Sequence, residues 1–263
     1  MDTNSKLWKS DHYYKKAGES SSAFDYPGMK VLKKYSIGAS RILDLGCGDG
    51  TRLNYLSRKN NKCYGVDISK KAISLSKKKY PKCDFTASNL EKLSFKDNSF
   101  DLVYSAFVLE HLKNPQKMLK EATRVLEPSG VLILMAPNFG SPNRISPPGK
   151  YSRVKKLLVG VFSDLSRPFI KVNSLKWRKV TPIEINDPKE YSIDCDTTIE
   201  PYIGDLVPFL KNKNFKIIKS SSLWSQDSKG GSILNLVVKS LGKIGLYPFT
   251  NWGPHLLVVA KKI

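Results

Sequence analysis

The chain lacks the residue patterns from which metal centres, disulfide frameworks and membrane spans are built. Its 263 residues include four cysteines, none in a C-x-x-C pair, and three histidines, none clustered with carboxylates at ligand spacing. We therefore predict no metal site, and buried thiols in a reducing compartment. No stretch approaches the roughly 18 apolar residues that cross a bilayer, and residues 1–6 lack the apolar core of a signal peptide. We therefore expect a cytoplasmic protein.

Acidic residues are also scarce. The 44 lysines and arginines outnumber the 23 aspartates and glutamates, which leaves a net charge of +21. Such a charge attracts polyanions and anionic surfaces, although solvated lysines on exposed helix faces account for it equally well. Hydrophobic residues make up 40% of the chain, which suffices for the core of one α/β domain and excludes wholesale disorder.

The strongest pattern that is present is a glycine-rich turn, R-I-L-D-L-G-C-G-D-G-T at residues 41–51. Alternating glycines remove the Cβ atom where φ must be positive, and they let backbone N–H groups approach a ligand at a helix N-terminus. A second apolar run, K-C-Y-G-V-D at residues 62–67, ends in Asp67. This is the interval expected for a carboxylate that receives ribose hydroxyls in a βαβ unit. Together the two runs predict a nucleotide-type binding site.

The glycine spacing G-x-G-x-G differs from the dinucleotide fingerprint G-x-G-x-x-G, which disfavours a dehydrogenase. Three later motifs extend the pattern of a nucleotide-type site. The later motifs are S-F-D-L-V-Y-S at 99–105, V-L-E-H-L at 108–112 and R-V-L-E-P-S-G-V-L-I-L-M at 124–135. With them, the chain resembles the class I S-adenosylmethionine-dependent methyltransferases, in particular the type 11, quinone-biosynthesis-like group, between residues 40 and 138.

The resemblance implies an α/β fold with a Rossmann-like, seven-stranded, mostly parallel sheet. The last strand pair is expected to be antiparallel, helices to cover both faces, and insertions to follow the fifth and sixth strands. The chain would form a single domain whose parts are an N-terminal lid or edge segment (1–40), a cofactor-binding core (41–138), an insertion that caps the substrate (139–200), and a sheet completion (201–263) containing an apolar insertion (226–250).

Hydrophobic periodicity and turn residues place the individual elements. We expect helices at 51–58, 69–79, 115–126, 151–165 and 202–213, and strands at 84–87, 99–105, 131–135, 215–220 and 255–260.

The resemblance also implies S-adenosylmethionine as cofactor. Asp44 is expected to orient its amino group, and Asp67 to hold its ribose. Asn89 stands where the family usually has an acidic residue, but its side-chain carbonyl can still accept a hydrogen bond from the adenine amino group. The full set of expected contacts is Asp44, Gly46, Cys47, Gly48, Gly50, Asp67, Ile68, Ser88, Asn89, Leu90 and Ser105, the last nearest the methyl donor.

Methyl transfer mainly requires that the acceptor be aligned with the donor in a dry pocket. His111 is the candidate general base for a hydroxyl acceptor, and a structural role in the V-L-E-H-L turn is the alternative. Glu110 is adjacent to it, and because adjacent side chains on a helix do not face each other, we do not predict a dyad. The resemblance favours O-methylation of a small-molecule, glycan or lipid-linked acceptor.

Two alternatives remain open, an RNA methyltransferase that uses the basic surface and a cofactor-binding module without catalysis. The chain has no D/N/S-P-P-aromatic motif after the fourth strand and no Pro-Cys nucleophile, so we do not expect specific nucleic-acid binding. Residues 151–165 form a basic amphipathic pattern that suits a cap over the cleft, core packing, or peripheral contact with an anionic membrane at its inner face. Tyr13 and Tyr14 are lid candidates.

Overall fold

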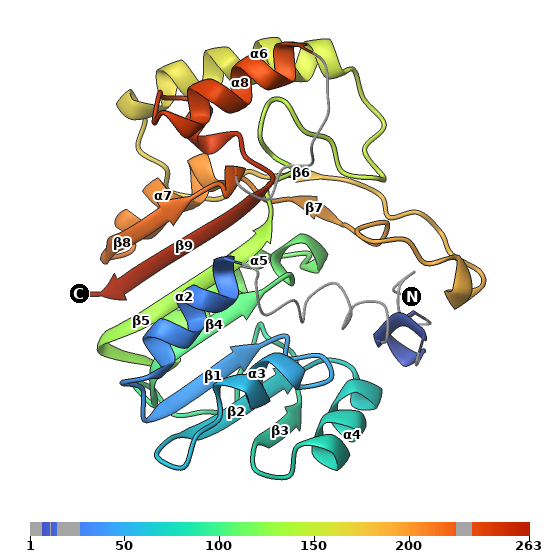
Figure 1. Cartoon of the computed structure of the whole chain (residues 1–263), viewed down its shortest axis with the longest axis vertical. Coiled ribbons are helices and arrows are strands. Elements are labelled where there is room, and N and C mark those ends of the chain that lie inside the picture. Colours follow the sequence, from blue (N-terminus) through green and yellow to red (C-terminus); the bar gives the residue numbers. More distant parts are fainter. Residues whose placement is uncertain (1–6, 11, 15–26, 225–232) are drawn as a thin grey trace.

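The computed structural model describes residues 7–10, 12–14, 27–224 and 233–263. Figure 1 shows one central sheet with strand order β3-β2-β1-β4-β5-β9-β8. Strand β9 is antiparallel to the other six strands, since it pairs antiparallel with both β5 and β8. The predicted fold class and its antiparallel strand pair are therefore confirmed. The strands are β1 (Arg41–Leu45), β2 (Lys62–Asp67), β3 (Asp84–Ala87), β4 (Phe100–Ala106), β5 (Leu126–Pro137), β8 (Phe215–Ser221) and β9 (His255–Lys262).

Helices cover both faces of the sheet because alternate strand residues point to opposite sides. Ile42 packs in a cluster with residues of α2, α3 and α4, whereas the next residue, Leu43, packs in a cluster with residues of α5 and α7. Each face therefore has its own apolar core. The helices are α2 (Pro27–Ser36), α3 (Thr51–Leu56), α4 (Lys70–Lys79), α5 (Pro115–Val125) and α7 (Ile203–Lys211).

Two insertions extend the molecule beyond the sheet, and their helices α6 and α8 lie at the top of Figure 1. The first follows β5 and the second follows β8, as predicted, although residues 226–232 of the predicted 226–250 insertion lie outside the described residues. No helix in the described ranges is long and apolar enough to cross a membrane. The elements of the insertions are α6 (Arg153–Ser166), η3 (Arg167–Phe169), the strand pair β6 (Arg178–Lys179) and β7 (Ile199–Glu200), η4 (Pro188–Glu190), α8 (Ile233–Lys243) and η6 (Phe249–Asn251).

Several element ends follow from identifiable residues. The Ser69 side chain caps α4 by accepting from the Ala72 N–H, and Asn114 caps α5 in the same way before Pro115. The helix expected over 51–58 ends early, because Ser57 adopts an extended backbone. Leu126 likewise leaves the predicted helix and begins β5, since its own backbone is extended.

One bend and one joint shape the edge of the sheet where the insertions begin. Ser129 has a φ of 67°, the left-handed region that favours glycine, and it lies within an irregularity of β5. Asn138, fully buried just beyond β5, donates to the Asn251 and Gly253 carbonyls and accepts from the Ile203 N–H. It therefore connects the end of β5 to the first residue of α7 and to the segment before β9.

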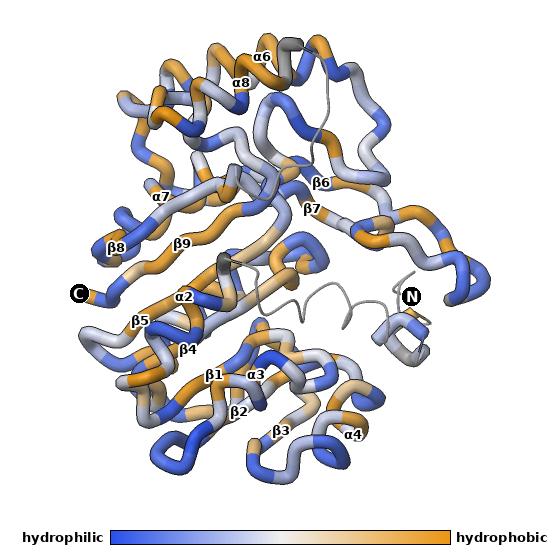
Figure 2. The backbone as a smooth tube through the Cα atoms, in the orientation of Figure 1, coloured by the Kyte–Doolittle hydropathy of each residue, from blue (hydrophilic) through white to orange (hydrophobic). Residues whose placement is uncertain are grey.

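Hydropathy follows the same plan. Figure 2 shows hydrophobic backbone segments along the central strands β5 and β9, and again along α6 and α8 at the periphery. The first group is the buried core. The second lies on the layer farthest from the sheet centre.

Candidate functional site

The glycine loop joins β1 to α3 in a conformation that side chains would not permit. Gly46, Gly48 and Gly50 all have positive φ, at 85°, 54° and 79°. A Cβ atom on Gly46 would lie 2.3 Å from a methyl carbon of Val108, and one on Gly50 would lie 2.7 Å from the Phe85 ring. Two of the three glycines are therefore required by their neighbours inside the protein.

Gly48 differs, because a Cβ atom there would meet nothing within 4 Å. Its N–H donates to Asp67 Oδ2 at 3.0 Å, and the Ser69 N–H donates to Asp67 Oδ1 at 2.9 Å. Burial raises the pKa of Asp67, and these N–H groups oppose that shift. The structure thus brings together the two halves of the predicted nucleotide site, and it leaves open space beside Gly48.

Asp44 is among the most deeply buried of the predicted site residues. It is fully buried, and one carboxylate oxygen accepts from the Tyr104 hydroxyl at 2.7 Å while the other, Oδ1, has no hydrogen-bond partner among the described residues. Burial raises the pKa of Asp44 to about 6, against the opposing charge of Arg52. An orphaned buried oxygen indicates a missing donor at this point.

The predicted adenine contacts line the ends of β2 and β3. Ile68 is 57% exposed beside Asp67, and the Ser88 N–H donates to the Asp67 carbonyl at 3.0 Å. Asn89 is exposed, although its side-chain carbonyl already accepts from the Glu91 N–H at 2.9 Å. Leu90 is buried in the core.

Two predicted residues have side chains that are engaged within the protein. The Ser105 hydroxyl is buried and donates to the Leu45 carbonyl at 2.9 Å, fastening β4 to β1. The Cys47 thiol is buried under the loop, and burial raises its pKa. If either residue contacts a ligand here, it does so through its backbone.

His111 lies in η2 (Leu109–His111), directly after β4, within a cluster of carboxylates. Its Nδ1 is 3.5 Å from Asp196 Oδ2, and its Nε2 is 3.7 Å from Glu110 Oε1. Burial lowers the pKa of His111, but the charges of Asp196 and Glu110 outweigh burial and the net shift is upward. The expectation that Glu110 and His111 do not face each other is wrong, because the short 3-10 turn brings their side chains together.

Two carboxyl groups around His111 have raised pKa values. Glu110 is fully buried, neither of its oxygens has a hydrogen-bond partner among the described residues, and burial raises its pKa to about 8. Burial also raises the pKa of Asp194 to about 6. Asp194 and Asp196 come from the insertion after β5, so no local pattern near His111 could have pointed to them.

The described part of the N-terminal segment bridges this cluster and the nucleotide side. The Trp8 carbonyl accepts from the Ser69 hydroxyl at 2.6 Å, and the Tyr13 hydroxyl donates to Asp196 at 3.4 Å. The Tyr13 ring also meets the Tyr191 ring edge-on at 4.8 Å, and the Tyr14 hydroxyl donates to the Trp8 carbonyl. The predicted lid segment 1–40 includes residues 1–6, 11 and 15–26, which lie outside the described residues.

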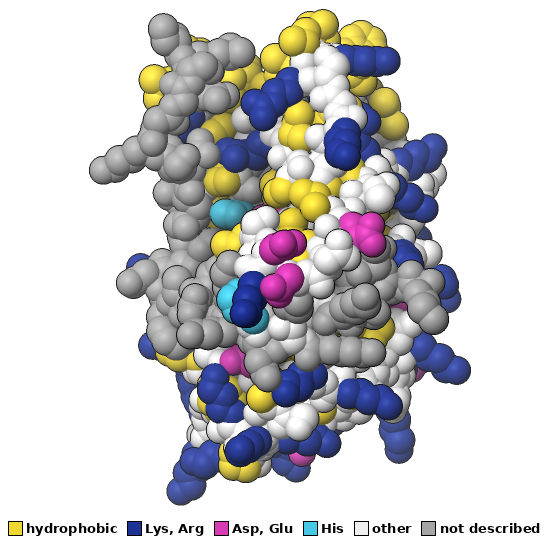
Figure 3. All heavy atoms as spheres, turned by 90° about the vertical axis from the view of Figure 1, so that its right-hand side faces the viewer, with side chains coloured by type: hydrophobic (Ala, Val, Ile, Leu, Met, Phe, Trp, Pro, Cys, Tyr) yellow, Lys and Arg dark blue, Asp and Glu magenta, His cyan; other side chains and the backbone are white. Residues whose placement is uncertain are grey.

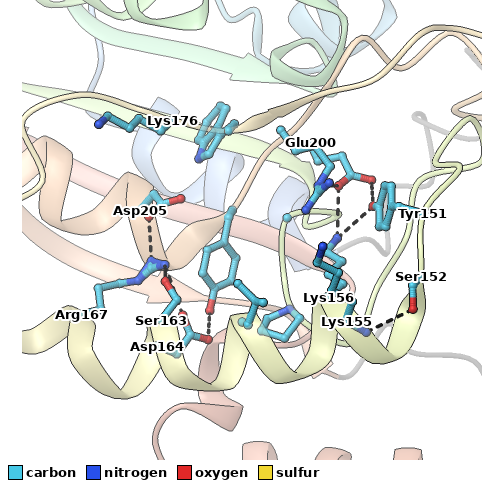
Figure 4. A pocket seen from close by; sticks show the side chains of 17 residues that line it. Tyr151, Ser152, Lys155, Lys156, Ser163, Asp164, Arg167, Lys176, Glu200 and Asp205 are labelled. Atoms are coloured by element: carbon cyan, nitrogen blue, oxygen red, sulfur yellow. Dashed lines mark hydrogen bonds and ion pairs between the residues drawn. The ribbon is translucent and has the colours of Figure 1, made fainter.

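A separate cavity of about 550 Å³ lies in the insertion, bounded by α6, β6, β7 and α7 (Figure 4). Its buried acids are all matched. Glu200 accepts from Ser146, Tyr151 and Lys156, whose ammonium group is 3.2 Å away. Asp164 accepts from the Tyr202 hydroxyl and the Trp252 indole, and Arg167 pairs with both Asp164 and Asp205.

Three further cations line this cavity, two of them with no carboxylate within ion-pair distance among the described residues. Lys155 and Lys176 are exposed at its rim. Arg178 lies 4.3 Å over the Tyr151 ring, and it shares Glu200 with Lys156, at 3.9 Å. Residues 196–200 connect the cavity to the His111 cluster, and four residue steps span at most about 14 Å between Cα atoms. The cavity thus carries excess positive charge within reach of the site edge.

Within the described ranges, no group of three or more His, Cys, Asp or Glu residues is arranged to hold a metal ion. All four cysteines are buried and free, as the sequence led us to expect.

Comparison with known proteins identifies relatives of this arrangement. The model of a methyltransferase domain matches residues 43–134. A probable S-adenosylmethionine-dependent methyltransferase of Mycolicibacterium smegmatis is 32% identical over 40% of this chain and 42% of its own length. A ubiquinone biosynthesis O-methyltransferase of Dechloromonas aromatica is 26% identical over 62% of this chain and 77% of its own length. The chain therefore spans less than half the length of the first of these relatives.

Among solved structures, an S-adenosylmethionine-dependent methyltransferase from Mesorhizobium loti superposes with a TM-score of 0.56. It is 17% identical, and the match covers 90% of this chain and 99% of that one. This likeness concerns the fold.

Proposed function

We propose that the chain is a class I S-adenosylmethionine-dependent methyltransferase and that it methylates a small-molecule, glycan or lipid-linked acceptor; the family model, the curated relatives and the shared fold support this. The observation that carries the proposal is the junction of Gly48 and Asp67 beside open space, with the orphaned oxygen of Asp44 nearby in the preceding strand. S-adenosylmethionine, the cofactor of the family, supplies a methyl group that is already activated by its sulfonium.

The residues present fit this cofactor. We assign Asp44 Oδ1 to accept a hydrogen bond from the cofactor's amino group, directly or through water, because this oxygen is buried and lacks a donor. The backbone of Gly46, Cys47, Gly48 and Gly50 makes room for the methionine portion, since Gly48 faces open space. We assign Asp67 to the ribose hydroxyls, because each of its oxygens keeps a lone pair after accepting one N–H.

The adenine is assigned to the neighbouring strand ends. Ile68 offers an exposed apolar side chain, and Ser88, Asn89 and Leu90 complete the wall. Ser105 forms the edge nearest the methyl donor as a fixed backbone position, because its hydroxyl is occupied by Leu45.

We propose O-methylation, with His111 as general base. Asp196 on one ring nitrogen fixes the ring, and the other nitrogen lies 3.7 Å from Glu110. A neutral His111 can take the proton of an acceptor hydroxyl as the oxygen attacks the methyl carbon. The D. aromatica relative carries O-methyltransferase in its name, which supports this choice.

The insertion cavity favours an acceptor that bears an anionic group. Lys155 and Lys176 at its rim remain after the ion pairs are counted, and Arg178 shares the single carboxylate of Glu200 with Lys156. An acceptor whose reactive hydroxyl reaches His111 can place a phosphate or carboxylate there, since the connecting segment 196–200 is short. We place the enzyme in the cytoplasm, where its four free thiols are stable.

Calorimetric titration with S-adenosylmethionine and S-adenosylhomocysteine tests the cofactor assignment. We expect Asp67→Ala to weaken binding on the order of 10- to 100-fold, because a charged acceptor worth roughly 1.5–3 kcal/mol is lost. The control Asp84→Ala, at the exposed start of β3, should stay within about twofold of the parent. Unchanged affinity in Asp67→Ala rules out the ribose assignment.

Transfer of a labelled methyl group separates the alternatives. Incubation with cell extract followed by separation into lipid, soluble and RNA fractions should place the label in the lipid or soluble fraction. Label in RNA supports the RNA methyltransferase instead. Cofactor binding with no label in any fraction supports a module without catalysis.

A further inference from the structure

Exposed apolar side chains are concentrated on one part of the molecule. Of the 18 large apolar side chains that are exposed in the described residues, 12 lie within residues 154–170 and 236–247. Figure 1 shows α6 and α8 side by side at the top of the molecule, and in the quarter-turned view of Figure 3 yellow side chains gather at this end. We call the set the α6–α8 face: Val154, Leu158, Val159, Phe162, Leu165, Phe169, Ile170, Leu236, Val237, Ile244, Leu246 and Tyr247.

This exposure is not a fault of core packing. Leu157 and Val161 of α6 already pack against Val238 and Trp252 on the inward side. Val154, Leu158, Phe162 and Leu165 recur at helical spacing on another side of the same helix, where Phe162 is 77% exposed. The Phe169 side chain in η3 is 90% exposed. The helix therefore has one apolar side that is covered and one that is not.

The charges around the face are almost all positive. Lys150, Arg153, Lys155 and Lys171 accompany α6 and η3, whereas the acid in residues 150–171, Asp164, is buried and paired. Lys239 and Lys243 accompany α8, and residues 236–247 contain no acid. In Figure 3, dark blue side chains border the yellow end. A partner of this face must therefore offer both apolar volume and negative charge.

We propose that the α6–α8 face docks on an anionic lipid bilayer, with its apolar side chains inserted at the level of the headgroups and its cations on the phosphates. A second copy of the chain fits less well, because a self-complementary contact would oppose rims of like charge. Nucleic acid supplies negative charge but no use for a dozen aliphatic and aromatic side chains. Basic amphipathic helices with this pattern bind membrane surfaces.

Docking would place the bilayer on the ligand side of the sheet. Both insertions leave the carboxyl ends of parallel strands, β5 and β8, which is the edge that also carries the glycine loop and His111. The helix α6 lines the insertion cavity with Lys155, Ser163 and Arg167 while presenting Phe162 outward. That the acceptor is itself a membrane lipid rests on the proposed function; the docking does not.

Sedimentation of the 263-residue protein with vesicles tests the proposal. The vesicles are phosphatidylcholine, with or without about a third of phosphatidylglycerol, at low and high salt. We expect binding to the anionic vesicles to exceed binding to the neutral ones at least tenfold, and to weaken in high salt because surface charges are screened.

Matched variants assign the binding to the face. Phe162→Ser with Phe169→Ser should lower the partition coefficient at least tenfold, and Arg153→Glu with Lys243→Glu should do so on anionic vesicles alone. The control Ile37→Ser with Ile218→Ser removes two exposed apolar side chains elsewhere and should stay within about twofold.

The proposal is overturned if the protein binds neither kind of vesicle, or if the α6–α8 face variants and the control variant bind vesicles equally well. It is also overturned if light scattering shows that the parent is a dimer and that the phenylalanine variants are monomers. Cofactor titration of the same preparations keeps the two proposals apart. Lost vesicle binding with intact cofactor affinity concerns the face alone, and lost cofactor affinity with intact vesicle binding concerns the proposed function alone.

Discussion

Gly46 has the least space of the loop glycines, since a Cβ atom would lie 2.3 Å from Val108. We expect Gly46→Ala to lower the free energy of unfolding by about 3 kcal/mol, because overpacking adds to the strain of a positive φ. Gly48→Ala should cost only about 1 kcal/mol, since nothing lies within 4 Å and only the backbone strain remains. Urea denaturation measures both.

A double-mutant cycle identifies the cause. If Val108 is the obstacle, Val108→Ala should recover part of the loss in the Gly46→Ala background, giving a coupling energy of about 1 kcal/mol or more. Equal losses for the two glycine variants, or no coupling to Val108, would contradict the steric account.

His111 should impose a pH dependence on catalysis. Its pKa is raised because Asp196 and Glu110 outweigh the effect of burial, and a general base must be neutral. The rate constant kcat should therefore rise with pH through a range above that of an ordinary histidine, and Asp196→Asn should move this limb to lower pH. His111→Ala should lower kcat on the order of 10²- to 10⁴-fold. A limb that stays in place in Asp196→Asn would leave His111 a structural role only.

At the scale of elements, the short strand β6 should select the acceptor. Arg178 lines the insertion cavity, whereas its neighbour Lys179 does not. With an anionic acceptor, Arg178→Gln should raise KM about tenfold, in keeping with a charged hydrogen bond, and leave cofactor affinity unchanged. Lys179→Gln removes the same charge one residue away and should leave KM within twofold. Equal effects of the two variants would point to general surface charge.

The helices and strands also show which parts of the structure could be predicted from the sequence. The helix caps Ser69 and Asn114 and the buried strands depend on neighbours within a few residues, so their patterns predict the order of elements and the approach of Gly48 to Asp67. The partners of His111 could not be predicted in this way. Asp196 comes from an irregular insertion 85 residues later, and only the three-dimensional structure determines where that insertion returns.

The same limit applies to the pair β6 and β7, whose two-residue strands carry no periodicity. It also applies to Ser105, whose position at the end of β4 was predictable but whose hydroxyl turns toward Leu45. The apolar residues of 151–165 were visible as a pattern, but a pattern does not show which side of the helix is covered.

At the scale of the molecule, buried carboxylates make folding depend on pH. A carboxyl group whose pKa is higher in the folded state contributes stability below its unfolded pKa, and that contribution is lost as pH rises through the folded pKa. Glu110, with an unfolded value of 4.5 and a folded value of about 8, defines a window from pH 4.5 to 8. Asp44 and Asp194, each raised to about 6, act in the same direction.

The melting temperature should therefore fall between pH 5 and pH 8.5. Glu110→Gln should reduce that fall, because it removes the largest of these titrations, worth on the order of a few kcal/mol. The surface variant Glu127→Gln serves as control. If calorimetric scans give the same slope for Glu110→Gln and the parent, the buried carboxyl is not the source of the pH dependence.

The order of strands in the sheet has a consequence for biosynthesis. β9 lies between β5 and β8, yet it is the last of the seven strands to leave the ribosome. Strands β1 to β5, which carry the whole nucleotide-binding edge, can pair while translation continues. Strand β8 has no pairing partner until β9 is synthesised and inserts between β5 and β8. During that interval β5 exposes an unpaired edge, and a chaperone or an early ligand would protect the nascent chain most effectively there.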